Sequence, residues 1–98
     1  MLVRFADADL ARLECDRAFT GGYGAPVIKG FRKAMQAIRA AVDERDLYQM
    51  KSLRFEKLKG NRAHQRSMRL NERWRLILQI VAGEPKNTVV VVSIEDYH

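Results

Sequence analysis

The chain has 98 residues, 47% of them hydrophobic and 31% charged, which is enough for one modest core and excludes a large enzyme with a separate cofactor domain. No apolar run approaches the roughly 20 residues of a membrane-spanning helix, and the single cysteine, Cys15, excludes an internal disulfide, so we expect one cytoplasmic domain over residues 1–98. The formal net charge of +6 comes from 18 Lys and Arg side chains against 12 Asp and Glu, and this charge is unevenly distributed.

The first quarter of the chain predicts a strand, a helix and a turn. Residues 1–5 favour a short strand, and Asp7 is a suitable N-cap for a helix that extends to about Ala18. Cys15 lies in this helix without a neighbouring His or Cys, so we expect a half-buried thiol rather than a metal ligand. Residues 20–24 are rich in glycine, but their spacing and the missing Lys-Ser/Thr pair exclude a phosphate-binding P-loop and predict a plain turn.

A second helix follows this turn. Pro26 suits its first position, and apolar side chains then recur at steps of three and four residues, which is the spacing of one helix face. The predicted core stripe consists of Ile28, Phe31, Met35, Ile38 and Val42. A short turn or helix around residues 46–50 leads into the next part of the chain.

Residues 51–75 form a basic block. The block holds nine basic and two acidic side chains, a net charge of +7, whereas the rest of the chain carries a net charge of −1. A local excess of this size favours a surface that binds a polyanion, and nucleic acid is the first candidate because Lys and Arg neutralise phosphates. The alternative is a solvated face that keeps a small protein soluble.

The second half of the chain changes to a period of two residues, which is typical of strands. Met68 and Leu70 alternate with polar neighbours, and after a turn at residues 71–72 the alternation resumes at Trp74. This pattern predicts a β-hairpin. Residues 88–94 are apolar at nearly every position and predict a third strand inside the sheet.

These elements predict an α+β fold of order β-α-α-β-β-β, in which two helices pack on one face of a small, mostly antiparallel sheet. When the apolar side chains of the hairpin face the helices, Arg69, Arg73 and Arg75 must share the opposite face. Basic groups then line the uncovered side of the sheet. The chain ends directly after the third strand, so we expect its last side chains, residues 95–98, to lie beside this basic face.

Three motifs occur in a fixed order in this part of the chain. They are the turn Phe55–Arg62, which contains Leu-Lys-Gly-Asn-Arg, the hairpin segment Ser67–Leu76, and the terminal Asp96-Tyr97-His98. In order and spacing they resemble the HigB-type toxins of the RelE/ParE superfamily of bacterial toxin–antitoxin systems. The pattern of that family is Leu-Lys-Gly-Asp/Asn-Arg, then Ser-Ile-Arg-Val-Asn-x-x-Trp-Arg, then Asp-Tyr-His, and its fold is the arrangement that periodicity predicts.

The resemblance implies the toxin of a type II toxin–antitoxin system. Such a toxin is a ribosome-dependent mRNA interferase that cuts translated mRNA without a metal or other cofactor. The implied partners are the ribosome, mRNA and a cognate HigA-like helix-turn-helix antitoxin that neutralises the toxin. Operator DNA is expected to be contacted only through the antitoxin complex, and no membrane is implied.

The resemblance also implies roles for particular side chains. The chemistry needs a base for a ribose 2′-OH, cations for the phosphorane, and an acid for the leaving oxygen. The expected catalytic residues are Arg75, Asp96, Tyr97, His98 and Glu56. The expected RNA-binding residues are Lys57, Lys59, Arg62, Arg66, Arg69 and Arg73. The imidazole of His98 suits proton transfer near neutral pH, Tyr97 can stack on a base or hold a phosphate, and Asp96 can orient His98 or act as base.

One position departs from the family pattern. Some members carry a catalytic histidine in the loop before the hairpin, where this chain has Glu56. Glu56 can replace that histidine as general base, although basic neighbours stabilise its charged form and make it a weaker base. A slower nuclease, or one with different roles for its residues, is therefore an open alternative.

Two other functions remain as alternatives. A ParE-like toxin of the same superfamily would poison DNA gyrase without catalysis, but the terminal Asp-Tyr-His together with Lys59, Arg69 and Arg75 belongs to the RNase branch. A stand-alone RNA-binding domain is the third reading, and the chain lacks the paired aromatics of an RNA-recognition-motif sheet.

Overall fold

The computed structural model describes residues 1–96. Within these residues it contains a five-stranded sheet, three α-helices and two short 3₁₀ turns. In chain order the elements are β1 Leu2–Phe5, α1 Ala8–Cys15, α2 Ala25–Ala40, α3 Glu44–Gln49, η1 Lys51–Leu53, β2 Glu56–Lys57, η2 Gly60–Arg62, β3 Gln65–Arg69, β4 Trp74–Val81 and β5 Thr88–Asp96. The strand order is β1-β5-β4-β3-β2, with β1 parallel to β5 and the other neighbours antiparallel, which confirms the predicted fold class.

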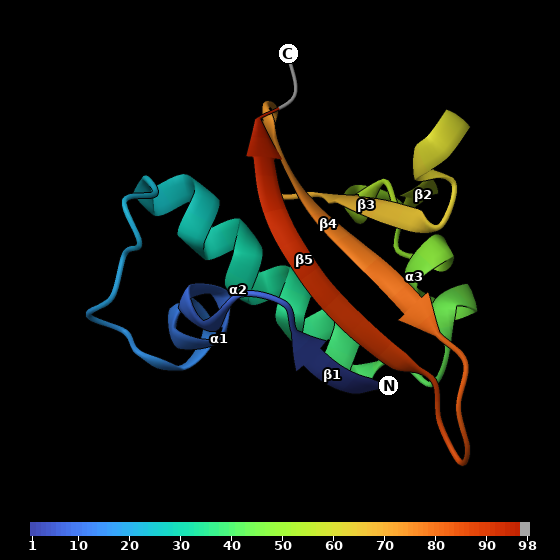
Figure 1. Cartoon of the computed structure of the whole chain (residues 1–98). Coiled ribbons are helices and arrows are strands. Elements are labelled where there is room, and N and C mark those ends of the chain that lie inside the picture. Colours follow the sequence, from blue (N-terminus) through green and yellow to red (C-terminus); the bar gives the residue numbers. More distant parts are fainter. Residues whose placement is uncertain (97–98) are drawn as a thin grey trace.

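The α1 and α2 helices pack on one face of the sheet. In Figure 1 α2 passes behind β5 and α1 lies beside it, and no helix of the described residues covers the front of β4 and β5. The core lies between the two layers, where the fully buried side chains from the helices meet those of the sheet. The largest of them are Leu13, Phe31, Met35, Ile38, Met68, Leu76, Leu78, Val89 and Val91. Among residues 1–96 no helix is long and apolar enough to cross a membrane.

The α1 helix begins as predicted and ends earlier. The carboxylate of Asp7 accepts a hydrogen bond from the backbone N–H of Asp9 at 2.8 Å, which caps the first turn. The helix stops at Cys15 instead of Ala18, because Asp16 adopts an extended conformation and its side chain accepts from the N–H of Ala18 at 3.0 Å. The thiol of Cys15 is exposed, not half-buried as predicted.

The α2 helix carries most of the predicted core stripe. Ile28, Phe31, Met35 and Ile38 are buried, as the spacing of three and four residues predicts. Val42 does not belong to the stripe: the helix ends at Ala40, and the side chain of Val42 is 77% exposed.

The hairpin and the last strand set which side chains share a face. Cα partners across β3 and β4 include Met68 with Leu76 and Arg69 with Arg75, so the apolar pairs face the helices and the arginines face away. The pairing of β4 with β5 shifts between Ile77 and Leu78, which is a β-bulge in β5. As predicted, β5 has a neighbouring strand on each side.

The short turn or helix predicted around residues 46–50 is the α3 helix, whereas the η1 turn and the β2 strand were not predicted. The α3 helix, the η1 turn and the two-residue strand β2 connect α2 to the hairpin, and β2 extends the sheet beyond β3. Leu47, Leu53 and Phe55 anchor this connection in the core, and the rings of Tyr48 and Phe55 meet edge to face at 4.7 Å. A strand of two residues has no alternation to recognise, so sequence periodicity does not reveal it.

Candidate active site

Arg75 is held rigidly on the sheet face that points away from α1 and α2. Its Nε donates to the hydroxyl of Ser67 at 3.1 Å, and its Nη2 donates to the same oxygen at 2.9 Å and to the carbonyl of Arg54 at 2.6 Å. Ser67 is fully buried, and only 12% of the Arg75 side chain is exposed. These bonds fix the plane of the guanidinium. A guanidinium with a fixed plane can bind a phosphate in a defined orientation.

The carbonyl of Arg54 reaches Arg75 because the backbone turns sharply at this position. Arg54 adopts the left-handed conformation, with φ 46° and ψ 48°, directly after the η1 turn. This conformation is uncommon for a residue with a side chain. It ends η1 and directs the following residues into β2, alongside β3. One local backbone feature therefore both supports Arg75 and positions the next strand.

Glu56 lies on β2 directly beside this group. Its Cα partner on β3 is Ser67, and its Oε1 lies 3.5 Å from Nη2 of Arg75. The carboxylate is 60% exposed, so water screens its attraction to the guanidinium. The structure thus brings together two of the predicted site residues, a solvent-facing carboxylate and a largely buried cation.

A second carboxylate, Glu95, faces the same side of the sheet. It is the Cα partner of Arg75 across β4 and β5. Both of its oxygens accept from Arg62, at 3.2 and 2.9 Å, and Oε2 also accepts from the hydroxyl of Ser93 at 3.0 Å. The hydrogen bonds from Arg62, then those from Ser93, lower the pKa of Glu95 against the opposing effect of burial. Glu95 is therefore charged at neutral pH and is suited to positioning Arg62, not to donating a proton.

Other predicted RNA-binding residues surround this group. Arg69 is the Cα partner of Arg75, and its Nε donates to the carbonyl of Asn71 at 3.2 Å. Lys57 on β2 and Lys59 just before η2 are exposed. These cations extend the basic surface along the edge of the sheet.

Three further predicted site residues, Arg66, Arg73 and Asp96, form ion pairs in the structure. Arg66 is the Cα partner of Leu78, so it points toward the helix layer, where its Nε donates to Glu44 of α3 at 3.2 Å and only 17% of its side chain is exposed. Arg73 is exposed and pairs with Asp96 at 2.8 Å. Asp96 is the Cα partner of Trp74, whose ring packs against the core, whereas Glu95 is the carboxylate beside Arg75.

Comparison with known proteins identifies the family of the chain. Residues 4–98 match the model of the HigB-like toxins, described as the RelE-like toxin of the type II toxin–antitoxin system HigB. The chain belongs to this family. Among solved structures, the toxin is similar to a YoeB/ParE toxin from Agrobacterium tumefaciens, with a TM-score of 0.62, 14% sequence identity and full coverage of both chains, a likeness that concerns the fold. No curated protein matches its sequence.

Three groups of the candidate site were not predicted from the sequence. Ser67, the carbonyl of Arg54 and Glu95 all contact predicted cations. The alternation of the hairpin would have put Ser67 on the face of Arg75, but only the register between β3 and β4 shows that the two side chains meet. Tyr97 and His98, which were predicted to be catalytic, lie outside the described residues. In the part of the chain that the structure describes, no three His, Cys, Asp or Glu side chains gather as metal ligands would.

Proposed function

We propose that this toxin is a ribosome-dependent mRNA interferase of the cytoplasm, which cuts translated mRNA without a metal and is neutralised by a cognate HigA-like helix-turn-helix antitoxin. The observation that carries the proposal is the buttressed guanidinium of Arg75 beside Glu56, on a basic sheet face of a HigB-like toxin. A fixed cation and an exposed carboxylate supply two of the three groups that RNA transesterification needs.

The proposed reaction is an internal transfer at one phosphate. The 2′-oxygen of a ribose attacks the adjacent phosphorus, its proton passes to a base, and the bond from phosphorus to the 5′-oxygen breaks. The 5′-oxygen takes a proton from an acid, which leaves a 2′,3′-cyclic phosphate and a 5′-hydroxyl. Arg75 stabilises the charge on the phosphorane, and Glu56 is the candidate base because its carboxylate is exposed to the substrate side.

The remaining proposed roles follow the family resemblance. His98 is the proposed proton donor, Tyr97 the residue that stacks on a base or holds a phosphate, and Asp96 an orienting group. Arg69, Lys59, Lys57, Arg62 and Arg73 are proposed to bind the RNA backbone. Arg66 is also proposed to bind the RNA backbone, and its ion pair with Glu44 would have to open for it to do so.

The decisive experiment is to express the toxin alone and map the new 5′-hydroxyl ends of cellular RNA. The proposal expects growth arrest with cuts inside coding regions, and loss of these cuts when initiation of translation is blocked. Intact mRNA together with DNA breaks would instead support the ParE-like alternative, a toxin that inhibits DNA gyrase.

Variants test the proposed residues. Arg75→Lys keeps the charge but not the planar fork, and we expect cleavage to fall by about a hundredfold, as when a single charge-stabilising donor is removed. Deletion of His98 should have a similar effect. Arg4→Lys, on an exposed position of β1, is the matched control and should leave cleavage unchanged. Full activity of the variant lacking His98 would remove the C-terminus from the proposed active site.

Glu56→Gln separates the two roles of this residue. If Glu56 is the base, the variant should be nearly inactive and should lose the acidic limb of its pH–rate profile. If it is only a surface carboxylate in a basic groove, removal of its charge should leave the rate unchanged and strengthen RNA binding. Glu84→Gln, in the exposed turn between β4 and β5, is the control for the same chemical change.

A further inference from the structure

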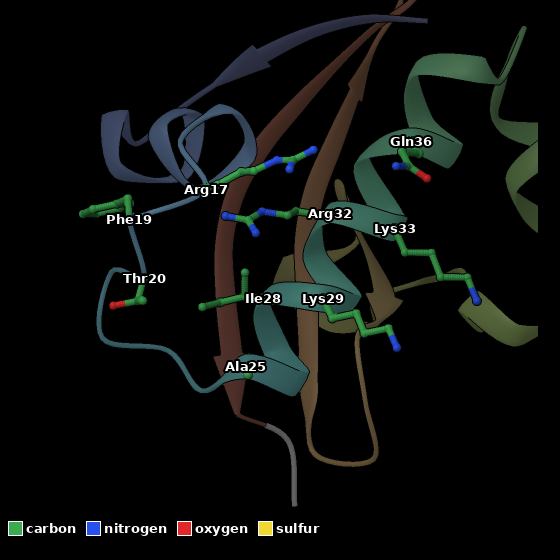
Figure 2. A pocket seen from close by; sticks show the side chains of 9 residues that line it. All are labelled: Arg17, Phe19, Thr20, Ala25, Ile28, Lys29, Arg32, Lys33 and Gln36. Atoms are coloured by element: carbon green, nitrogen blue, oxygen red, sulfur yellow. The ribbon is translucent and has the colours of Figure 1, made fainter.

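A basic hollow lies on the helix layer, on the other side of the sheet from Arg75. It has a volume of about 460 Å³ and lies between α2 and the segment that follows α1 (Figure 2). Its lining residues are Arg17, Phe19, Thr20, Ala25, Ile28, Lys29, Arg32, Lys33 and Gln36. Four of these side chains are cationic and none is acidic, so the hollow has a strong preference for an anionic ligand.

The hollow has an apolar floor and a cationic rim. Ile28 points from α2 toward the loop that carries Phe19, and Lys29 and Lys33 project from the adjacent side of the same helix (Figure 2). Ile28 and Phe19 pack against the core, whereas both lysines are exposed and form no ion pair within residues 1–96. A ligand that fits must therefore combine apolar groups with negative charge.

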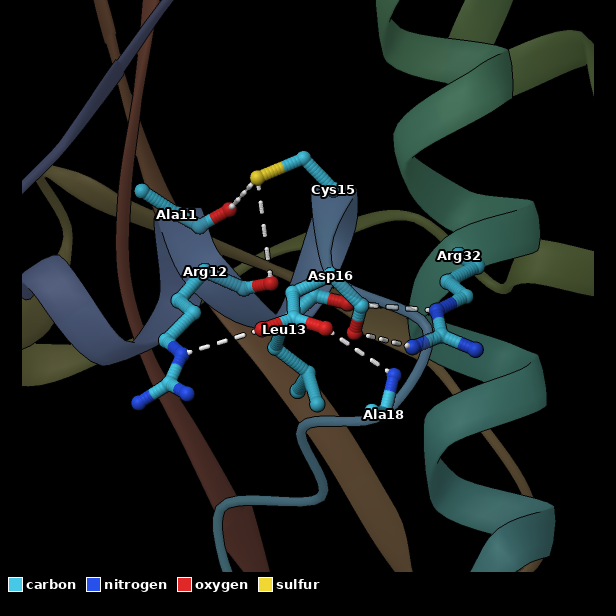
Figure 3. Close-up of polar contacts among 7 residues, drawn as sticks. All are labelled: Ala11, Arg12, Leu13, Cys15, Asp16, Ala18 and Arg32. Carbon is cyan, nitrogen blue, oxygen red and sulfur yellow. Dashed lines mark hydrogen bonds and ion pairs between the residues drawn. The ribbon is translucent and has the colours of Figure 1, made fainter.

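The part of the hollow at Arg32 is held in place by hydrogen bonds. Arg32 donates from Nε to the carbonyl of Leu13 at 3.1 Å and from Nη2 to the carbonyl of Asp16 at 3.1 Å (Figure 3). These bonds satisfy carbonyls at the C-terminal end of α1 and tie it to α2. The hollow is thus framed by two helices that are cross-linked by hydrogen bonds, and its shape is set before any ligand arrives.

Two carboxylates at the end of α1, Glu14 and Asp16, have cationic partners that do not line the hollow. Glu14 accepts two hydrogen bonds from Arg39, at 2.7 and 2.6 Å, and Asp16 pairs with Arg12 at 3.3 Å. Both acids are therefore committed to cations outside the hollow. The positive charges of Lys29 and Lys33 can therefore interact with an acidic partner.

We infer that this hollow binds an acidic, amphipathic helical segment of a protein partner. The α2 residues of the lining recur at helical spacing from Ala25 to Gln36, which spans about 16 Å along the helix axis. A partner helix lying along this stripe can place apolar side chains over Ile28 and carboxylates beside Lys29 and Lys33. The family implies one protein partner, the antitoxin, as the source of such a segment. The inference rests on family membership and not on the proposed RNase chemistry.

An RNA strand fits the hollow less well. Strands bound without sequence preference stack bases on open aromatic faces. The one aromatic ring of the lining, that of Phe19, carries the guanidinium of Arg12 at 4.3 Å from its centroid. The apolar floor also has no hydrogen-bond donor or positive charge that could bind a phosphate. RNA binding here is therefore the competing outcome of the test.

The test measures binding of two fluorescent probes to the full-length toxin. One is a short helical peptide with leucines along one face and glutamates on its flanks, and the other is a short oligouridine. Lys29→Glu/Lys33→Glu should weaken peptide binding by about tenfold, because two attractive contacts become repulsive. The matched double charge reversal Arg4→Glu/Lys86→Glu, at exposed positions outside the hollow, should change it less than twofold.

Two further measurements make the result specific. Ala25→Leu, which fills the hollow from an exposed position, should also weaken the peptide but not the oligouridine. RNA cleavage by Lys29→Glu/Lys33→Glu should equal that of the parent toxin. If the parent toxin itself has no nuclease activity, that result refutes the proposed function and leaves this inference intact. Equal peptide binding by all variants, or a tenfold loss of oligouridine binding alone, would overturn the inference. Circular dichroism verifies that each variant is folded.

Discussion

Ser67 shows how much one buried hydroxyl contributes to the proposed site. Among the described residues it is the one buried polar residue. Its hydroxyl oxygen accepts hydrogen bonds from both Nε and Nη2 of Arg75. Burial of a hydroxyl is costly unless it forms hydrogen bonds, so the pair stabilises the fold and orients the guanidinium through the same contacts.

We predict that Ser67→Ala reduces RNA cleavage by about tenfold through kcat, because Arg75 loses the two hydrogen bonds that it donates to this hydroxyl and becomes less ordered. Ser67→Thr retains the hydroxyl and should recover most of the activity. Steady-state kinetics of both variants, with circular dichroism as the folding control, provide the measurement. If Ser67→Ala raises KM alone, or changes only stability, Ser67 does not position Arg75 for the chemical step.

Glu95 makes stability depend on pH. Its pKa is lowered in the folded state by Arg62 and Ser93, so the stabilisation it provides is present above its ordinary pKa of 4.5 and is lost as the pH falls through the lower folded value. We predict that Glu95→Gln reduces the fall in stability below about pH 4.5 that the parent toxin shows. Urea unfolding at a series of pH values measures this effect. Parallel stability curves for the two proteins would contradict the prediction.

Gly30 shows that α2 and the hairpin are fitted closely at the scale of elements. A Cβ at this position would overlap the carbonyl oxygen of Leu70 and lie 2.9 Å from its carbonyl carbon. These are backbone atoms of the residue directly after β3, which a side-chain rotation cannot move away. The glycine therefore allows the helix to approach the strand, although glycine is a poor residue for a helix interior.

We predict that Gly30→Ala lowers the free energy of unfolding by about 2 kcal/mol, because the overlap outweighs the roughly 1 kcal/mol by which alanine favours a helix. Gly24→Ala is the matched control, since its Cβ would meet only Pro26 Cδ, at an ordinary 3.8 Å. Thermal or urea unfolding of both variants provides the comparison. An unchanged or higher stability of Gly30→Ala would mean that the helix can shift without cost.

Sequence periodicity predicted the elements whose side chains alternate or recur over several turns. The stripe from Ile28 to Ile38 and the hairpin around Arg69 and Arg75 are confirmed, because burial on one face imposes the pattern directly. The pattern could not reveal β2, which has two residues, nor the contact of Arg75 with Arg54, 21 residues earlier in the chain. Contacts of this kind depend on how distant elements pack, and local sequence does not encode them.

At the scale of the whole molecule, the basic block has fewer unpaired cations than its composition suggests. Four of its nine cations form ion pairs, with Glu95, Glu44, Asp96 and Glu56. Three of these carboxylates lie outside residues 51–75, and 22 to 33 residues of chain separate them from their partners. A charge count along the sequence therefore overestimates the number of counterions that RNA binding releases, because carboxylates already neutralise the paired arginines, including those proposed to contact the RNA.

Five cations of the block form no ion pair within the described residues: Lys51, Arg54, Lys57, Lys59 and Arg69. A single-stranded RNA releases counterions in proportion to the phosphates neutralised, with a slope of log K against log salt of about −0.7 for each. We predict a slope near −3.5 for the toxin, instead of the roughly −6 expected if all nine cations contribute. Lys59→Gln should reduce the slope by about 0.7, whereas Lys86→Gln, in the turn between β4 and β5, should not change it. Oligouridine titrations at increasing salt measure both values: a slope near −6 would mean that RNA displaces the carboxylates from their arginines, and a flat response would mean that the block is only a solvated surface.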